Sequence, residues 1–209
     1  MACPRPQNVG AMACPRPQLF THHTSLYMKN ILFIVGSLRK NSFNLRLAHQ
    51  AASLLEGKAE VTFLDYTQLP FMNQDIEFPA PEAVDRVRRL VAASDGLWIF
   101  SPEYNHSYPG HLKNLLDWLS RPLVKNDPQR LSSLTGKKLC LSGAAGKSAA
   151  SDCMDKLTEL LDLARAVVMK EPRFGVSLPF QSFVDDSFSL TDDQIADLRK
   201  QAEAFLSFI

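Results

Sequence analysis

The stretch Asn30-Ile-Leu-Phe-Ile-Val-Gly-Ser-Leu-Arg-Lys-Asn-Ser-Phe-Asn44 indicates how this chain folds. It opens with five apolar residues, Ile31 to Val35, most of them β-branched and none charged. Such a run is typical of a strand that is buried on both faces, as in a parallel sheet. Gly36 ends the run, and a polar loop leads to a helical pattern that begins at Leu45.

The loop after this strand carries groups that suit an anion. A strand, a loop and a helix N-terminus together present free backbone N–H groups and the positive end of the helix dipole. Ser37, Ser42 and Asn44 add neutral donors. Arg39 adds a forked cation. We therefore predict a phosphate site here; the alternative is an ordinary strand–helix turn in which Asn41 or Ser42 caps the helix.

The composition describes an ordinary globular chain. Its 209 residues are 45% hydrophobic and 22% charged, which suits one domain with a sizeable core. The formal net charge of +1 provides no general attraction to nucleic acid or to an anionic membrane. The four cysteines form no CxxC pair and have no zinc-type spacing with histidine, so we expect a reducing, cytoplasmic setting and no metal site.

Residues 1–27 differ from the rest of the sequence. The heptapeptide Met1-Ala-Cys-Pro-Arg-Pro-Gln7 recurs unchanged at residues 12–18, and the segment has neither a helical nor a strand period. A duplicated peptide of this kind indicates a disordered leader, either natural upstream sequence or an addition to the chain. We expect the folded domain to cover residues 28–209.

Strand and helix patterns alternate through that domain. Strands are expected at residues 31–35, 61–64, 97–100, 138–142 and 167–169, with helical patterns between most of them and one after the last. This alternation predicts an α/β fold with a doubly wound, five-stranded parallel sheet. In a sheet of order 2-1-3-4-5, the first and third strands are neighbours, and ligands bind outside their carboxyl ends.

The loops that follow the first and third expected strands are the most polar of the domain. The second of them, Ser101–Gly110, ends with Pro109, a residue that suits the first turn of a helix. Both loops therefore point to one crevice at the switch point of the sheet. The long segment 65–81 is open to two interpretations, a lid or subunit contact and a packed surface connection.

Two other phosphate-binding loops do not fit the sequence. A dinucleotide fingerprint needs GxGxxG after the first strand, where only Gly36 is present. A Walker A loop needs GxxxxGK[ST]; residues 146–148 supply its end, but Leu141 stands where its first glycine belongs. Gly143 lies too close to Gly146 in the sequence to replace that glycine, because the loop between them would be too short to wrap a phosphate. The remaining interpretation is a mononucleotide phosphate that is held by the first loop.

Two motifs make the chain resemble the NADPH-dependent FMN reductase family. The first is Gly36-Ser37-Leu38-Arg39 with Ser42 and Asn44, and the second is Pro102-Glu103-Tyr104-Asn105 with Pro109-Gly110, Leu112-Lys113-Asn114 and Asp117-Trp118. The resemblance covers Met28 to about Arg173. It implies a flavodoxin-like fold, FMN as cofactor, NADPH or NADH as electron donor, and a homodimer or homotetramer.

The resemblance also implies the site residues. Those that match the family's phosphate loop are Ser37, Arg39, Ser42 and Asn44; those that match the loop beside the isoalloxazine ring are Pro102, Glu103, Tyr104 and Asn105; a third flavin loop falls at Ser142, Gly143 and Ala144. Because a carboxylate would repel an anionic reduced flavin, we expect Glu103 to turn away, toward a subunit contact. His106 either reaches the mouth of the site or is solvated.

The function implied by the resemblance is that of an oxidoreductase. It would transfer electrons from NAD(P)H through FMN to a small acceptor by a ping-pong mechanism: a quinone, an azo or nitro compound, a metal oxyanion or free flavin. The cofactor carries this chemistry, so we name no catalytic side chain. The alternatives are a flavodoxin-type electron carrier, usually a strongly acidic protein and so disfavoured by the charge of +1, and a regulatory flavoprotein with little turnover.

Overall fold

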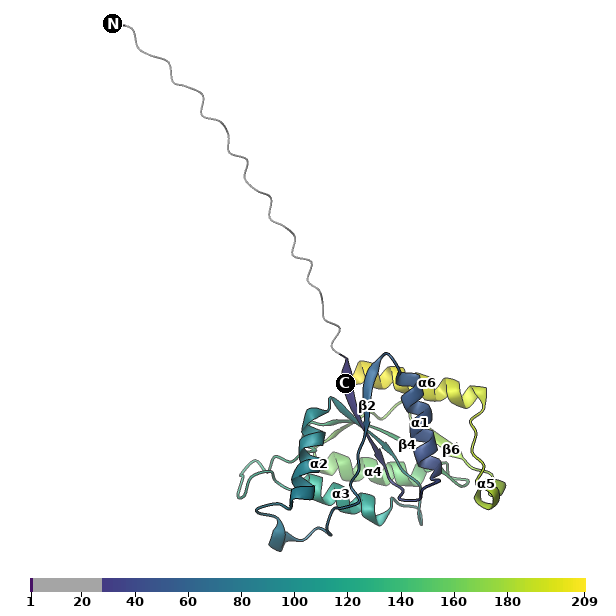
Figure 1. Ribbon diagram of the computed structural model, residues 1–209, viewed down its shortest axis with the longest axis horizontal. Helices are drawn as coiled ribbons and strands as arrows, with labels where there is room; N and C mark the ends of the chain where they lie inside the picture. Colours follow the sequence, from purple (N-terminus) through teal and green to yellow (C-terminus); the bar gives the residue numbers. More distant parts are fainter. Residues whose placement is uncertain (2–27) are drawn as a thin grey trace.

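Helices cover both faces of one six-stranded sheet in the computed structural model, which describes Met1 and residues 28–209 (Figure 1). The strands are β1 (Lys29–Val35), β2 (Ala59–Phe63), β3 (Gly96–Phe100), β4 (Lys138–Ala145), β5 (Val167–Val168) and β6 (Phe174–Ser177). The helices are α1 (Phe43–Leu55), α2 (Glu82–Ala93), α3 (Gly110–Ser120), α4 (Ser151–Leu163), α5 (Phe180–Asp185) and α6 (Asp192–Phe208), with a short 3-10 helix, η1 (Gln74–Ile76). The predicted leader, apart from Met1, lies outside the described residues.

The strand order confirms the predicted fold. The strands run parallel in the order β2-β1-β3-β4-β5, with β6 also paired to β4. β1 is central, and its residue Ile31 stands beside Val61 of β2 on one side and Gly96 of β3 on the other. The switch point of this flavodoxin-like sheet therefore lies between β1 and β3, as the sequence predicts.

The apolar run of β1 feeds two cores, one on each face of the sheet. Leu32 and Ile34 pack in a cluster with residues of α2, α3 and α4. Ile31 and Phe33 pack in a second cluster with residues of α1 and α6. All four side chains are buried, because successive residues of a strand point to opposite faces and both faces are covered by helices.

The fifth strand position is split into two short strands, of which the sequence predicted only the first. The Leu139 carbonyl accepts from the Met169 N–H at 2.8 Å, and the Ala145 carbonyl accepts from the Leu178 N–H at 2.8 Å. Carbonyl groups of successive residues point to opposite edges of a strand, so these two carbonyls, which are an even number of residues apart, lie on the same edge of β4. β5 and β6 therefore follow each other along that edge.

A side chain fills the break between β5 and β6. The buried Gln201 of α6 donates from Nε2 to the Leu141 carbonyl at 2.9 Å and to the Pro172 carbonyl at 3.1 Å. Its Oε1 accepts from the Ser142 hydroxyl at 2.7 Å, and Ser142 Oγ accepts in turn from Trp98 Nε1 at 2.9 Å. Because proline has no N–H for the ladder, the amide of Gln201 supplies the donor that the interrupted strand lacks.

The segment 65–81 is fastened to α3. The Pro70 carbonyl accepts from Asn114 Nδ2 at 2.9 Å and from Trp118 Nε1 at 2.8 Å. These contacts favour the packed surface connection over the lid. Phe71 nevertheless stays 86% exposed, so one apolar side chain of the segment projects to solvent.

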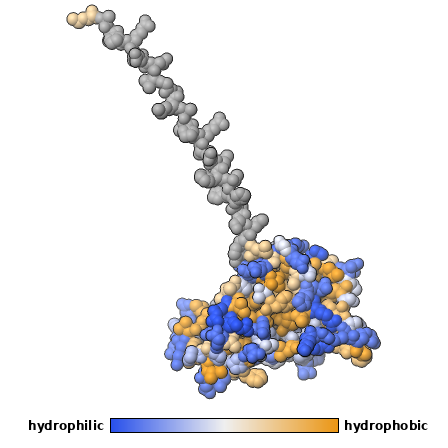
Figure 2. All heavy atoms as spheres, viewed as in Figure 1, coloured by the Kyte–Doolittle hydropathy of each residue, from blue (hydrophilic) through white to orange (hydrophobic). Residues whose placement is uncertain are grey.

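Hydrophobic residues lie scattered among hydrophilic ones over the face of the domain that Figure 2 shows. Some large apolar side chains project strongly, including Leu163 at 85% and Phe180 at 82% exposure. None of the helices in the described part of the chain combines the length and hydropathy that crossing a membrane requires.

Candidate functional site

A pocket of about 330 Å³ opens at the carboxyl ends of β1, β3 and β4. The loops that follow these strands supply most of its lining, and α1 and α5 supply the rest. The lining residues are Ser37, Arg39, Ser42, Phe43, Asn44, Pro102, Glu103, Tyr104, Ala144, Ala145, Gly146 and Phe183. The pocket thus lies at the switch point, where the sequence places the crevice.

The structure gathers eight of the eleven predicted site residues around this pocket and leaves three outside its lining. The eight are Ser37, Arg39, Ser42, Asn44, Pro102, Glu103, Tyr104 and Ala144. Of the others, Asn105 is exposed at the tip of the second loop with φ of 52°. Ser142 binds Trp98 and Gln201 inside the domain, and Gly143 is buried below the pocket.

Two polar residues of the first loop are already engaged by the backbone. Ser42 Oγ accepts from the Leu45 N–H at 3.3 Å, so it caps α1. The amide of Asn44 pairs with Ala144 in both directions, accepting from its N–H and donating to its carbonyl, each at 2.9 Å. Asn44 therefore fastens the first loop to the end of β4, and it fixes the distance between two walls of the pocket.

The second loop is held by the first turn of α4. Oε2 of Glu103 accepts from the Cys153 N–H at 3.0 Å, and only 6% of the Glu103 side chain is exposed. Glu103 thus turns toward a helix of its own chain rather than toward a subunit contact. The reason is that the first turn of a helix carries free N–H groups, which offer a carboxylate partners inside the domain.

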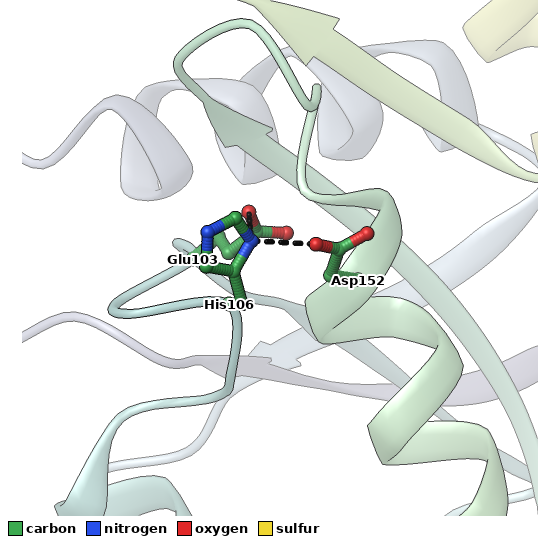
Figure 3. Close-up of side chains that lie close together, drawn as sticks. All are labelled: Glu103, His106 and Asp152. Carbon is green, nitrogen blue, oxygen red and sulfur yellow. Dashed lines mark hydrogen bonds and ion pairs between the residues drawn. The ribbon is translucent and has the colours of Figure 1, made fainter.

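His106 and Asp152 fasten the same loop from outside (Figure 3). His106 Nδ1 lies 2.6 Å from Asp152 Oδ2 and 3.8 Å from Glu103 Oε1. The three side chains place donor atoms within 4.8 Å, close enough to hold a metal ion. The imidazole–carboxylate pair accounts for the geometry without an ion, however, and His106 is 77% exposed. We therefore treat the group as a clasp between the loop and α4.

Two glycines allow the third loop to pack closely. A Cβ on Gly143 would lie 2.5 Å from Ala150 Cβ and 2.6 Å from the Ser101 carbonyl oxygen. A Cβ on Gly175 of β6 would lie 2.2 Å from the Ala149 carbonyl oxygen. Gly143 thus has a packing role: it brings the end of β3 and the start of α4 against β4, below the wall of the pocket.

Sequence reasoning missed four lining residues: Phe43, Ala145, Gly146 and Phe183. The expected third loop includes Ala144, and the lining extends from it to Gly146. Phe183 belongs to α5, whose six residues are too few to show a helical period in the sequence. Its ring lies 5.5 Å from that of Phe43 in an edge-on contact. The proline before α5, Pro179, is the signal that could have indicated the helix.

Neither cysteine in the described part of the chain offers a nucleophile at neutral pH. Burial raises the pKa of Cys153 to about 11, and burial also raises the pKa of Cys140 well above its ordinary value. Both thiols therefore stay protonated near pH 7. The chemistry of the pocket must come from groups other than a thiolate.

A second hollow, of about 630 Å³, lies between α3, the segment after it and the end of α4. Charged residues line much of it, among them Lys113, Arg121 and Arg165. It gathers none of the predicted site residues, and it lies away from the carboxyl ends of β1 and β3. For these reasons we place the functional site in the pocket at the switch point.

Comparison with known proteins agrees with the geometry. A family model described as NADPH-dependent FMN reductase matches residues 29–180. The chain is 34% identical over 177 residues to a 2-hydroxy-1,4-benzoquinone reductase from Burkholderia sp, covering 84% of this chain and 91% of that protein. It is 32% identical over 187 residues to a quinone reductase of Escherichia coli strain K12, covering 86% and 94%.

A solved structure extends the likeness to three dimensions. The flavoenzyme FerB, an NAD(P)H:(acceptor) oxidoreductase from Paracoccus denitrificans, matches with a TM-score of 0.74 and 32% identity, over 86% of this chain and 96% of that one. The family match covers both loops that carry the predicted motifs and most of the sheet. This chain belongs to the NADPH-dependent FMN reductase family, whose members are oxidoreductases that use FMN and NAD(P)H.

Proposed function

We propose that this oxidoreductase binds FMN in the pocket at the switch point and passes electrons from NAD(P)H to quinones. The observation that carries the proposal is the mixed chemistry of the pocket lining. The first loop contributes a cation and a hydroxyl group from Arg39 and Ser37, and the second and third loops contribute backbone groups and an aromatic ring. We assign the first loop to a phosphate end of the pocket and the other two loops to a ring end. A ligand with a charged phosphate and a flat ring matches such a division.

The first end suits the phosphate of FMN. Arg39 offers a forked cation and Ser37 a hydroxyl group, and both line the pocket. α1 begins at Phe43, directly after this loop, so its unpaired N–H groups and positive dipole end lie at the same place. In our proposal Ser42 and Asn44 shape this end, while Arg39 and Ser37 bind the phosphate.

The second end suits the isoalloxazine ring. The backbone N–H and carbonyl of Glu103 and the N–H of Gly146 have no hydrogen-bond partner among the described residues, so they offer donors and an acceptor on two walls. Tyr104 is 52% exposed and presents an aromatic face. The wall formed by Ala144, Ala145 and Gly146 takes up little space, because these residues have small side chains or none. We propose that these groups hold the ring flat and leave one face open to substrates.

The roles of the chain in the reaction follow from this arrangement. When bound, FMN supplies the hydride and electron chemistry that no side chain here can perform. The loops bind and orient the ring, and the lining of small apolar groups limits the access of water. Nicotinamide and acceptor would use the same open face in turn, which gives a ping-pong mechanism. Quinones are the first acceptor class to test, because two relatives carry that activity in their names; azo and nitro compounds, metal oxyanions and free flavin follow.

We further propose that the protein is a cytoplasmic homodimer or homotetramer, and that its folded domain covers residues 28–209. Phe71, Leu163 and Phe180 are each more than four-fifths exposed, and association would remove such apolar area from water. The two cysteines in the described part of the chain are free, which fits a reducing compartment. Light scattering tests the assembly: a monomer at micromolar concentration would contradict it.

Steady-state kinetics of the FMN-loaded protein test the proposed reaction. With benzoquinone as acceptor, double-reciprocal plots against NADPH or NADH should be parallel. Replacement of Tyr104 by alanine should raise both Michaelis constants together, because both substrates would use one face. Intersecting plots would contradict the shared face. Reduction by NAD(P)H that is too slow to support turnover with any acceptor would indicate an electron carrier instead.

A further inference from the structure

The guanidinium that the proposed function assigns to the FMN phosphate already holds a carboxylate. Nη2 of Arg39 donates to one carboxylate oxygen of Asp186, the residue that directly follows α5. Asn41 Nδ2 donates to the other oxygen at 3.2 Å. An acidic side chain from a distant part of the sequence therefore occupies the cation at the phosphate end of the pocket.

A second arginine fixes the backbone at Asp186. Nη1 of Arg46 donates to the Asp186 carbonyl at 2.7 Å, and Nη2 of Arg46 donates to the Asn41 carbonyl at 3.3 Å. Asp186 itself adopts the left-handed conformation, with φ of 63°. Arg46 thus joins the end of α5 to the first loop, and the carboxylate of Asp186 is held within reach of Arg39.

An aromatic platform holds both guanidinium groups. Arg39 and Arg46 each lie 4.9 Å from the centre of the Phe43 ring. Phe183 of α5 packs edge-on against the same ring and lines the pocket. The end of α5 is therefore attached to the phosphate end through both charge and aromatic packing, which keeps the backbone at Asp186 beside Arg39.

The neighbouring carboxylate shows that this arrangement is specific. Asp185 accepts from the Ser187 N–H at 2.9 Å and from Gln181 Nε2 at 3.2 Å, both within its own turn of the chain. Asp185 forms no ion pair with an arginine of the described residues. Of these two adjacent acids, only Asp186 contacts the first loop.

The carboxylate and a phosphate require the same donors. Nη2 of Arg39 carries two hydrogens, and the Asp186 carboxylate and the Asn41 carbonyl accept them, the latter at 2.6 Å. A phosphate monoester carries a charge of about −1.5 to −2 near pH 7. A phosphate bound to Arg39 would repel the adjacent Asp186 carboxylate, and a phosphate offers more acceptor oxygens to Arg39 than a carboxylate does. The exposed ion pair is the weaker partner and can be displaced.

We propose that Asp186 is a built-in competitor for the FMN phosphate and that it sets the affinity of the protein for its cofactor. The proposal rests on the proposed function, because it requires the phosphate of FMN at Arg39. Without FMN, Asp186 holds Nη2 of Arg39, and the phosphate of FMN displaces the carboxylate from that nitrogen. Riboflavin has no phosphate, so it leaves the contact between Asp186 and Arg39 in place.

Flavin titrations of the cofactor-free protein test the competition. The substitution Asp186→Asn keeps the shape of the side chain and tolerates the left-handed backbone, but it removes the competing charge. FMN should then bind about twofold to fivefold more tightly, the range expected when an exposed ion pair no longer has to be broken. Riboflavin affinity should not change. Asp185→Asn is the matched control and should leave both affinities unchanged.

A double-mutant cycle separates competition from simple charge repulsion. In an Arg39→Ala background the only arginine pair left to the Asp186 carboxylate among the described residues is the 3.5 Å contact with Arg46 Nη2, so Asp186→Asn should tighten FMN binding much less. A gain that persists undiminished in that background would overturn the proposal, as would weaker or unchanged FMN binding by Asp186→Asn alone. If Arg39→Ala weakens FMN while Asp186→Asn has no effect, the pocket assignment stands and the competition falls. If Arg39→Ala leaves FMN affinity unchanged, both fall.

Discussion

The two ends of the pocket are built in different ways. At the ring end, Glu103 is 6% exposed and its carboxylate accepts from a helix N–H inside the domain. At the phosphate end, the side chains of Arg39 and Asp186 are 48% and 39% exposed and meet as an ion pair. The ring end is thus part of the folded structure, whereas the phosphate end is an exposed contact that can exchange its partner.

This difference has an energetic consequence. Breaking a buried hydrogen bond leaves a desolvated polar group and costs about 1–3 kcal/mol. An exposed ion pair contributes about 0–1 kcal/mol to stability. Changes at the ring end should therefore appear mainly in the free energy of unfolding, and changes at the phosphate end should appear mainly in cofactor affinity.

The largest expected effect on stability is at Gly143, below the ring end. An alanine there would place its Cβ 2.5 Å from Ala150 Cβ and 2.6 Å from a backbone oxygen, so β3, β4 or α4 must shift. We expect Gly143→Ala to lower the free energy of unfolding by about 1–3 kcal/mol, the usual cost of overpacking. Chemical denaturation of the cofactor-free protein measures the change.

Gly146, in the same loop, provides the control. No atom lies within 4 Å of a Cβ built there, so Gly146→Ala should change the free energy of unfolding little. Equal losses for the two variants would contradict the close packing that we assign to Gly143.

A smaller effect is expected at Glu103. Glu103→Ala removes the carboxylate that accepts from the first turn of α4, and the loss of such a cap typically costs about 0.5–2 kcal/mol. Asp152→Ala breaks a pair in which both side chains are at least 47% exposed, so it should cost about 0.2–1 kcal/mol. Thermal or chemical denaturation compares them; a larger loss for Asp152→Ala would reverse the ranking of buried over exposed contacts.

The smallest effect concerns pH and His111, at the start of α3 beside the ring-end loop. Burial lowers the pKa of His111, its Nε2 is buried without a partner in the described part of the chain, and its ring stacks on Tyr66. The folded protein thus keeps this imidazole neutral at a pH where the unfolded chain, with a pKa of 6.5, takes up a proton. Stability should fall as pH drops below 6.5, by at most about 1.4 kcal/mol per pH unit.

A substitution assigns this pH dependence. His111→Gln should reduce the loss of stability between pH 6.5 and the lowered pKa of His111. If the free energy of unfolding of His111→Gln depends on pH as steeply as that of the unaltered protein, the buried imidazole does not cause the loss of stability at low pH.

Much of the fold could be predicted because its signals are local and strong. The apolar run of β1 and the leucine stripe of α3 fix a strand and a helix by burial alone, and alternation of such elements permits few topologies. The crevice followed from the topology, since parallel strands end at one edge. The loops after β1 and β3 could be predicted as binding loops because their polar residues directly follow the strands.

The remainder depends on contacts between distant residues. β6 has four residues and follows Pro172, so no periodic pattern marks it, and its place beside β4 depends on Gln201 from α6. Ser142 ends the strand that the sequence predicts, as a ligand-binding serine does, but in the structure it lies inside β4 and its hydroxyl has a partner in the core. Asp186 contacts Arg39 across 147 residues, and nothing in either local sequence announces the pair.

The most direct test of the account compares FMN and riboflavin binding in Arg39→Ala while the free energy of unfolding is measured in parallel. A charge-assisted hydrogen bond contributes about 1.5–3 kcal/mol, so FMN should bind about tenfold to hundredfold more weakly. Riboflavin affinity and stability should stay close to those of the unaltered protein, because riboflavin has no phosphate and the contacts of Arg39 with Asp186, Asn41 and Phe43 are made by a side chain that is 48% exposed. Equal losses for both flavins, or a loss of FMN affinity that follows a loss of stability, would contradict the assignment of the phosphate to an exposed, exchangeable end of the pocket.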